Sequence, residues 1–168
     1  MRIIVKDANI IFSLLDSELM DLCLKLDYEF WTSDFVINEI EDTGQKRKIG
    51  KYVKDKRINI YSYNGEEVAQ IFELSENRSL SDADCSVFLL TQIKNGILLS
   101  SDRALRAFAT RNGIEVKGMI WILDELVKNK IMDPSAAAEK LEFIAENSMW
   151  LPASEVESRI NRWKGMSK

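Results

Sequence analysis

The most informative absence in this sequence is histidine, because the 168 residues contain none. Without histidine the chain cannot form a Ser-His-Asp triad, a nuclease site with a histidine base, or a zinc site that requires imidazole. Its two cysteines are too few for a zinc site made of thiolates alone. Any hydrolytic chemistry would therefore depend on carboxylates and hard metal ions.

Cysteines and long apolar runs are also scarce. Cys23 and Cys85 both fall in helix-like sequence, so we expect two buried, inert thiols rather than a structural disulfide. Free thiols fit the reducing cytoplasm. No apolar run approaches the roughly 20 residues that span a bilayer, and the N-terminus leads into a strand-like segment without a signal-peptide pattern. We expect a cytoplasmic protein with no membrane association.

Positive charge is in deficit, with 23 Lys and Arg against 27 Asp and Glu, which gives a net charge of −4. This balance argues against binding nucleic acid through charge alone. Bound cations, however, would reverse the sign of an acidic cleft locally. The hydrophobic share of 46% supports a full core, and the length suits one compact domain with a small helical appendage.

Short apolar runs alternate with longer amphipathic segments, which is typical of βα units and a parallel sheet. Strands are expected at Arg2–Asp7, Glu29–Thr32, Arg57–Tyr61, Ile97–Ser100 and Ile114–Lys117. Helical segments are expected at Glu18–Leu26, Glu66–Leu74, Asp82–Ile93 and Arg103–Arg111, and again from Ile120 onward with stops at Pro134 and Pro152. The pattern predicts an α/β domain over residues 1–132 and a helical C-terminal extension over residues 133–168.

Two aspartates follow the strongly apolar strands. Asp7 ends the first strand and Asp102 follows the fourth. Ligands bind beyond the carboxyl ends of strands in open α/β sheets, so these carboxylates would meet at one edge if the strands are neighbours. The competing interpretation is that each aspartate caps the helix that follows it, a position where aspartate is favoured in any protein.

Two further acidic residues interrupt apolar helix faces. Glu39 lies between Val36 and Ile40 on a helix that begins near Ser33, and Asp84 shares a face with hydrophobic residues three and four positions further on. A charge on a buried face needs a partner or a metal ion. Asp82, on the neighbouring face, is expected to cap the helix or to support the site without binding the metal directly.

The four acidic residues and their sequence contexts resemble a PIN domain. The matching segments are Asp-Ala-Asn-Ile-Ile-Phe after the first strand, Glu39 in a helix after the second, Leu-Ser-Asp-Ala-Asp before a helix, and Ser-Ser-Asp-Arg-Ala-Leu-Arg after the fourth strand. The resemblance runs from Arg2 to about Gly118, and the extension beyond Ile120 is similar to a variant found among prokaryotic VapC-like proteins. It implies a three-layer PIN-like fold with a central parallel sheet of four to five strands flanked by helices.

The resemblance also implies a function. It suggests a metal-dependent nuclease that acts on RNA, often as the toxin of a toxin–antitoxin pair, so RNA and a cognate antitoxin protein are expected partners. The metal ligands carried over by position are Asp7, Glu39, Asp84 and Asp102, which would hold Mg²⁺ or Mn²⁺, with Asn9, Asp82 and Ser101 supporting the site. A homodimer is expected as well, formed through early helices that carry the apolar residues Leu19, Leu22 and Leu26 with Trp31 nearby.

Three questions stay open at this point. The basic stretch from Lys46 to Lys56 could position phosphates or could simply be a solvated helix face. A PIN-like module that binds RNA or protein without cleavage is the first alternative function, although a complete set of acids argues against it. A phosphoacceptor that resembles a response regulator is the second, but Asp7 lacks the adjacent acid that this chemistry needs.

Overall fold

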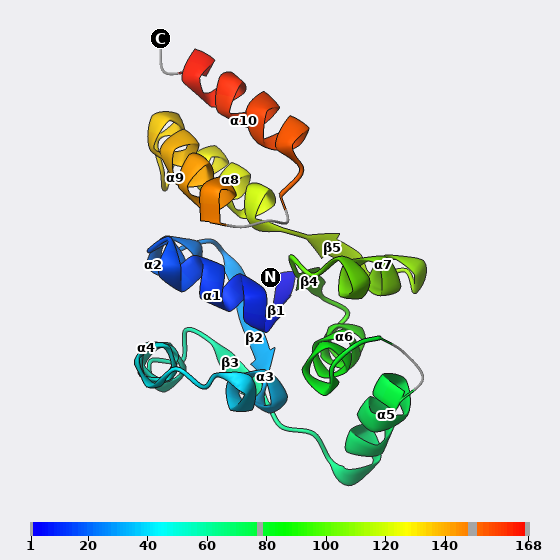
Figure 1. Cartoon of the computed structure of the whole chain (residues 1–168). Coiled ribbons are helices and arrows are strands. Elements are labelled where there is room, and N and C mark those ends of the chain that lie inside the picture. Colours follow the sequence, from blue (N-terminus) through cyan, green and yellow to red (C-terminus); the bar gives the residue numbers. More distant parts are fainter. Residues whose placement is uncertain (1, 77–78, 148–150, 167–168) are drawn as a thin grey trace.

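The computed structural model describes residues 2–76, 79–147 and 151–166, and its centre is a five-stranded parallel sheet (Figure 1). The strands are β1 (Arg2–Lys6), β2 (Tyr28–Ser33), β3 (Asn59–Tyr61), β4 (Ile97–Leu99) and β5 (Glu115–Lys117). Their order in the sheet is β3-β2-β1-β4-β5, and all four pairings are parallel. The prediction of an α/β fold with a parallel sheet of four to five strands is confirmed.

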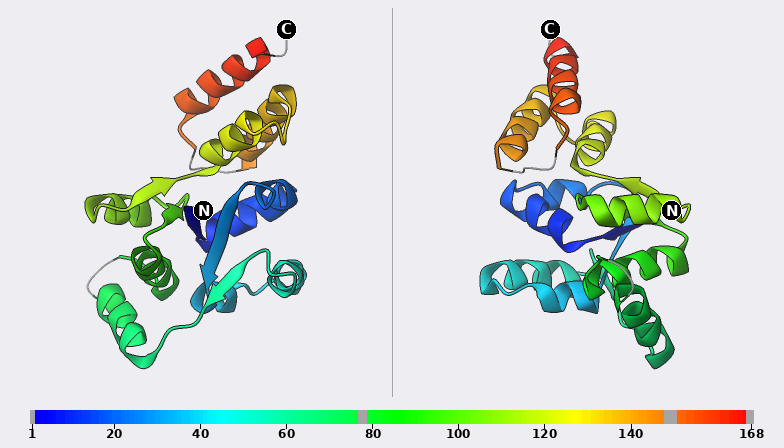
Figure 2. Two further views of the ribbon diagram at one scale, coloured as in Figure 1. Left: turned by 180° about the vertical axis from the view of Figure 1, so that it is seen from behind. Right: turned by 45° about the vertical axis from the view of Figure 1, so that its right-hand side comes forward.

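Helices connect the strands and flank the sheet, as parallel pairing requires. They are α1 (Ala8–Asp16), α2 (Met20–Cys23), α3 (Asp34–Glu39), α4 (Thr43–Lys54), α5 (Gly65–Glu76), α6 (Asp82–Lys94), α7 (Arg103–Arg111), α8 (Met119–Lys128), α9 (Pro134–Asn147) and α10 (Ala153–Met166). Helices α9 and α10 pack on each other at the end of the molecule remote from α5 (Figures 1 and 2). The helical C-terminal region is thus present, and the boundary predicted at residue 132 falls in the loop between α8 and α9.

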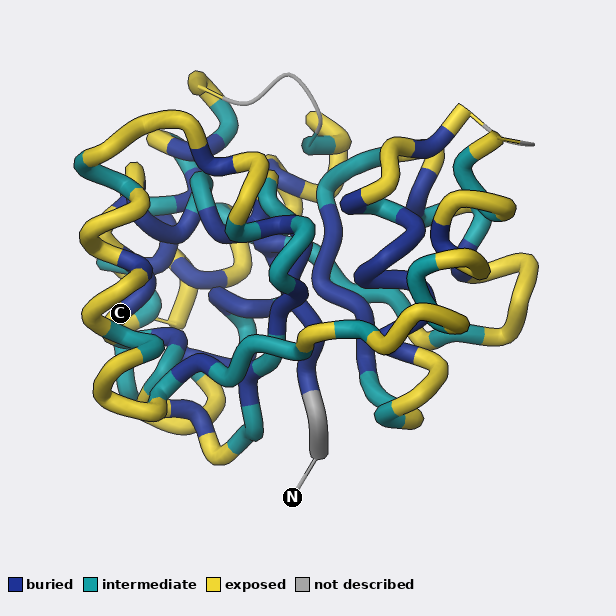
Figure 3. Tube along the Cα trace, turned by 90° about the horizontal axis from the view of Figure 1, so that it is seen from below, coloured by how far each residue is buried: buried dark blue, intermediate teal, exposed yellow. Residues whose placement is uncertain are grey.

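The core lies between the sheet and its covering helices, and Figure 3 shows the buried parts of the trace concentrated in the interior. Helix α6 contacts β1, β2 and β4, and almost every residue from Ala83 to Thr91 is buried. Its start is fixed by a capping box, in which Ser81 and Asp84 each bond the other's backbone N–H. Asp84 is therefore held at the first turn of the most enclosed helix of the described chain.

The sheet changes winding direction at β1. The chain passes from β1 to β2 and β3 on one side and then returns to place β4 on the other side of β1. The backbone N–H of Asp7 donates to the carbonyl of Leu99 over 3.1 Å, which extends the pairing with β4 one residue beyond the end of β1. The first and fourth strands are neighbours, so Asp7 and the residues after Leu99 emerge at the same edge.

The early helices differ from the sequence prediction. Helix α2 covers only four residues, because Glu18 adopts a left-handed conformation with φ 58° between α1 and α2. Leu19 and Leu26 are buried inside the chain's own core, whereas Leu22 and Trp31 are half-buried. Leu19 and Leu26 cannot form a dimer surface, so that part of the prediction was wrong. The apolar face that carries Leu19 and Leu26 packs against the rest of the same chain.

Two smaller predictions are confirmed. Cys23 and Cys85 are buried, and neither forms a disulfide within the described residues. Ser33 caps α3 by accepting a hydrogen bond from the backbone N–H of Val36 over 3.1 Å. Within the described ranges, no helix is long and apolar enough to cross a membrane.

Candidate functional site

Asp7 combines a capping role with an unsatisfied oxygen. Its Oδ1 accepts a hydrogen bond of 2.8 Å from the backbone N–H of Ile10 and so caps α1. Its Oδ2 is buried and has no hydrogen-bond partner among the described residues. Leaving a buried polar atom unpaired costs free energy, and such an orphaned acceptor needs an explanation. The cap that the sequence offered as an alternative is real, but it uses only one of the two oxygens.

Burial raises the pKa of Asp7 to about 7, and repulsion from Asp84 and Asp102 adds to the increase. The nearby Ser100 hydroxyl and the N–H of Ile10 oppose it. A buried carboxylate that cannot obtain enough hydrogen bonds becomes neutral more easily. A divalent cation beside Oδ2 would reverse this preference, because it would favour the ionised form.

Asp102 also caps a helix. Its Oδ1 accepts a 2.7 Å hydrogen bond from the backbone N–H of Leu105 at the start of α7. Its own N–H donates to Ser100 Oγ over 3.0 Å. Ser100, which is completely buried, therefore stands between the two strand-end aspartates. Sequence reasoning missed Ser100 and named Ser101, for which the described part of the chain shows no side-chain hydrogen bond. The sequence feature that could have identified Ser100 is its place at the end of the apolar strand Ile97–Ser100, at the same edge of the sheet as Asp7 and Asp102.

Asp84 lies in the first turn of α6 and is half-buried, as expected for an acid that interrupts an apolar face. Its Oδ2 accepts from the backbone N–H of Ser81 over 3.1 Å. Burial raises the pKa of Asp84, the two bonds to Ser81 lower it, and repulsion from Asp102 raises it further. Asp82 is exposed in the same turn, and it does not cap the helix as the sequence offered, because Ser81 occupies the N-cap position.

Glu39 lies elsewhere than predicted, because the residue is exposed rather than buried. Helix α3 ends at Glu39, and Ile40 already has an extended backbone, so Val36 and Ile40 enter the core while Glu39 does not. Its surroundings still exclude enough water to raise the pKa of its carboxyl, and repulsion from Asp84 and Asp82 raises the pKa further. Glu39 is therefore close enough to Asp84 and Asp82 to interact with them electrostatically, although its side chain is exposed.

The four acids thus influence one another at the carboxyl edge of the sheet. Repulsion from Asp84 and Asp102 raises the pKa of Asp7, repulsion from Asp102 raises that of Asp84, and repulsion from Asp84 raises that of Glu39. Within residues 2–76, 79–147 and 151–166, however, no three or more acidic, histidine or cysteine side chains are arranged to hold a metal ion. The donor set still suits a hard cation, because every donor is a carboxylate oxygen and Asp7 Oδ2 is unpaired. Exposed Asn9, at the first turn of α1, completes the predicted set.

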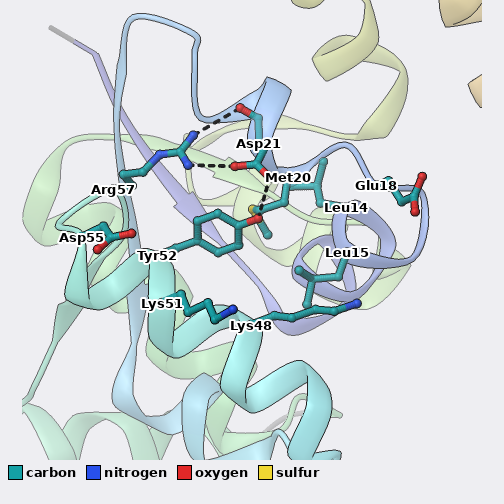
Figure 4. Close-up of a pocket in the computed structure, with 10 residues that line it drawn as sticks. All are labelled: Leu14, Leu15, Glu18, Met20, Asp21, Lys48, Lys51, Tyr52, Asp55 and Arg57. Carbon is teal, nitrogen blue, oxygen red and sulfur yellow. Dashed lines mark hydrogen bonds and ion pairs between the residues drawn. The ribbon is translucent and has the colours of Figure 1, made fainter.

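The basic stretch has a different environment. Lys48 and Lys51 of α4 line a hollow of about 490 Å³ together with residues of α1 and α2 (Figure 4). Asp21 lies in the same hollow, where Arg57 donates to its Oδ1 over 2.8 Å and Tyr52 donates to its Oδ2 over 3.1 Å. Glu18 and Asp55 also line it. Acids and bases alternate here, which favours the interpretation of a solvated, partly paired surface.

Comparison with family models places these residues in a known context. The model of the family DUF3368, described as "PIN domain", matches residues 3–165. The match spans the predicted nuclease domain and most of the C-terminal extension. A comparison with curated proteins returns no match.

Several solved structures are similar at low sequence identity, and the first described below supports the fold. A domain of a functionally unknown protein from Methanocaldococcus jannaschii DSM 2661 is 18% identical, with 71% of this chain and 91% of that chain covered and a TM-score of 0.51. A PilT N-terminus domain protein from Sulfolobus solfataricus P2 is 12% identical, with coverages of 75% and 92% and a TM-score of 0.44. FitAcB from Neisseria gonorrhoeae is 15% identical, with coverages of 67% and 95% and a TM-score of 0.40.

Proposed function

The chain belongs to the PIN-domain family, and we propose that it is a metal-dependent endoribonuclease that hydrolyses RNA phosphodiester bonds. The observation that carries the proposal is the buried, unpaired Oδ2 of Asp7 within a group of mutually repelling carboxylates. A fold gains no stability from such an arrangement. A cation that binds all of these oxygens would remove both the repulsion and the orphaned acceptor.

Each acid has a role in this proposal. Asp7, Asp84 and Asp102 bind Mg²⁺ or Mn²⁺, and Glu39 supplies a carboxylate from the rim. The caps at Ile10, Ser81 and Leu105 hold the first three carboxyl groups in place, because each uses one carboxylate oxygen. The second oxygen of each group is then available for the cation. Ser100 Oγ accepts from the N–H of Asp102 and so orders the turn between β4 and α7, while the bond from the Asp7 N–H to the Leu99 carbonyl ties the end of β1 to β4.

The bound metal would polarise the scissile phosphate, lower the pKa of the attacking water and stabilise the leaving oxygen. The chain then has three tasks: to hold the cation, to fix the RNA strand beside it and to keep the acids ionised. Histidine is not needed for any of them. A chain without histidine is therefore compatible with phosphodiester hydrolysis.

The test is RNA cleavage by purified full-length protein. We expect cleavage of single-stranded or structured RNA in the presence of Mg²⁺ or Mn²⁺ and its loss when EDTA is added. Restoring Mn²⁺ in excess over EDTA should restore cleavage, which controls for damage to the protein. Cleavage that persists in EDTA would rule out the metal mechanism.

A module that binds RNA or protein without cleaving is the other outcome of this experiment. It would be recognised by RNA binding without cleavage under every metal condition. The acids would then lack a catalytic reason for their repulsion. The non-catalytic module is therefore less well supported than the endoribonuclease.

We further propose that the protein is a VapC-like toxin that acts in the cytoplasm as a homodimer, restrained by a cognate antitoxin. Two buried cysteines that form no disulfide among the described residues fit that compartment. A neighbouring gene for a small protein with a DNA-binding N-terminus would support the antitoxin. Light scattering at micromolar concentration tests the dimer, and a monomeric mass would contradict it.

A further inference from the structure

A hollow of about 430 Å³ is lined by Ser101 and Arg103, the residues on either side of Asp102 in the sequence. Ser100, the end of β5 and the start of α8 also line it. Leu151, Pro152 and the first turns of α10 complete its lining. The C-terminal extension therefore supplies a wall of this hollow, and the volume is within the range of small-ligand sites.

The hollow carries a surplus of positive charge although the whole chain has a net charge of −4. Its basic residues are Arg103, Arg106, Lys117 and Arg159, and its acidic residues are Asp124 and Glu155. Arg159 is neutralised by Asp124 at 2.6 Å, and Lys117 is paired with Glu115 at 3.2 Å. In the described part of the chain, neither Arg103 nor Arg106 forms an ion pair. Two guanidinium groups thus remain for an anionic ligand, with Glu155 exposed at the rim.

Arg106 is built into the structure. Its Nη1 donates to the carbonyl oxygens of Ser100 over 2.8 Å and Lys117 over 3.0 Å, which ties the ends of β4 and β5 together. Gly118 permits this approach, because a Cβ there would lie 3.3 Å from Nη1. A guanidinium has five N–H donors, so those on Nη2 and Nε remain for a ligand. Its geometry suits a phosphate, which it can bind through two parallel bonds.

Arg103 lies at a position that helix stability does not explain. It is the first residue of α7 and is exposed, where a cation is opposed by the positive end of the helix dipole. Arg111, in the last turn of the same helix, has the favourable arrangement. Because the positive charge of Arg103 does not stabilise α7, binding of an anionic ligand explains this residue better than folding does.

Trp121 adds an aromatic surface. It lines the hollow, is half-buried, and packs against Tyr28 with a ring-centroid distance of 5.7 Å. Tyr28 is held in turn by its bond to Glu125 at 2.8 Å. An aromatic ring fixed from behind and next to cationic groups is the combination that binds single-stranded nucleic acid, since bases stack while phosphates pair with arginine.

We propose that this hollow binds one nucleotide of a single-stranded RNA, next to the phosphate that is cleaved. Arg103 and Arg106 bind its phosphate, Trp121 stacks on its base, and α10 closes the site. The proposal rests on the proposed function for its substrate class. It assigns to the C-terminal extension a part in holding the substrate strand.

The test measures binding of a fluorescein-labelled ten-nucleotide single-stranded RNA to the full-length protein in EDTA, by fluorescence anisotropy. EDTA separates binding from metal-dependent cleavage. We expect Arg103→Gln to weaken binding at least roughly 5-fold and to lower the slope of log K against log salt by about 1, as for the loss of one phosphate contact. Arg111→Gln, on the same helix with the same change of charge, should alter affinity less than about 2-fold.

Trp121 provides an independent arm. We expect Trp121→Leu to weaken binding at least roughly 5-fold and Trp121→Phe to restore most of it, because stacking requires a ring. Thermal melting checks that the variants are folded, and Arg103→Gln carries the test alone if the tryptophan variants are not.

Several outcomes would overturn the inference: absence of RNA binding by the wild type, equal effects of Arg103→Gln and Arg111→Gln, or wild-type affinity in folded Trp121→Leu. Binding with the expected losses but without cleavage in Mn²⁺ would contradict the proposed function and leave this inference standing. Metal-dependent cleavage at wild-type rates in both Arg103→Gln and Trp121→Leu would support the proposed function and contradict this inference.

Discussion

At the carboxyl edge of the sheet Asp7, Asp84 and Asp102 repel one another, whereas in the hollow between α1, α2 and α4 Asp21 is bound by Arg57 and Tyr52 (Figure 4). Both regions are rich in charge. The pKa of Asp21 is lowered by its bonds to Arg57 and Tyr52, while burial and like charges raise the pKa of Asp7 and of Asp84. Charges that complement each other contribute to folding, and charges that oppose each other indicate a ligand.

The largest expected effect is on catalysis at the edge. Asp84→Asn should keep the helix cap, because the amide oxygen can still accept from Ser81, and should reduce RNA cleavage at least roughly 10²-fold, as expected when a preorganised charge is lost. Circular dichroism checks folding and single-turnover cleavage measures the rate.

The matched control is Asp82→Asn in the same turn of α6, where the exposed carboxylate is replaced in the same way. Its effect on cleavage should be much smaller. If Asp82 proves the more sensitive position, the roles of the two aspartates are reversed.

The second effect is a dependence of metal-free stability on pH. The pKa of Asp7 is raised from 3.8 to about 7 on folding, so the folded state binds the proton more tightly. Stability is highest below the unfolded pKa and is lost as pH rises through about 7. Between pH 5 and pH 7.5 the free energy of unfolding in EDTA should fall by about 2 kcal/mol, as measured by urea denaturation. Asp7→Asn should remove most of this loss.

Asp42→Asn is the control for that measurement. Asp42 also caps a helix, by accepting from Gln45 over 2.6 Å, but it is exposed on α4. The variant should retain the pH dependence of the wild type. An unchanged pH profile in Asp7→Asn would mean that burial and like charges do not raise the pKa of Asp7 on folding.

The third effect separates capping from metal binding at Asp102. Asp102→Ala removes the bond to Leu105 and should cost about 0.5–2 kcal/mol. Asp102→Asn keeps the cap and relieves repulsion, so its melting temperature in EDTA should equal or exceed that of the wild type. The stabilisation by millimolar Mn²⁺ should largely disappear in Asp102→Asn, because a ligand group is lost. A clear loss of metal-free stability with an unaltered Mn²⁺ shift would make Asp102 purely structural.

The smallest effect is expected in the paired hollow. Asp21→Asn weakens its bond to Arg57, whose side chain is 35% exposed while that of Asp21 is 65% exposed. Such solvent-screened pairs contribute about 0.2–1 kcal/mol. Urea denaturation should show a loss of that size, and RNA cleavage should be unchanged. A large loss of cleavage would mean that Asp21 contributes to catalysis, which contradicts a purely structural role for this hollow.

Much of the candidate site could be predicted because its signals are local. An apolar strand followed by an acid predicted Asp7 and Asp102 at one edge, and the helix expected from Asp82 is α6, although Ser81 rather than Asp82 caps it. These features depend on residues a few positions apart, so the sequence contains the whole pattern. The exposure of Glu39 was missed because α3 ends at that residue, and Ile40 reaches the core with an extended backbone instead of continuing the helix.

The sequence by itself determined the alternation of strands and helices and the acids that follow the strands, because backbone propensity and capping act between near neighbours. Only the tertiary structure decided that β4 lies beside β1, that Ser100 stands between Asp7 and Asp102, and that residues from Ser100 to Arg159 form one hollow. Lys6 shows the same limit. It adjoins Asp7 in the sequence but is fully buried, with its ammonium 4.0 Å from the centre of the Phe30 ring. Contacts between distant residues follow from how the layers pack, and no local pattern specifies them.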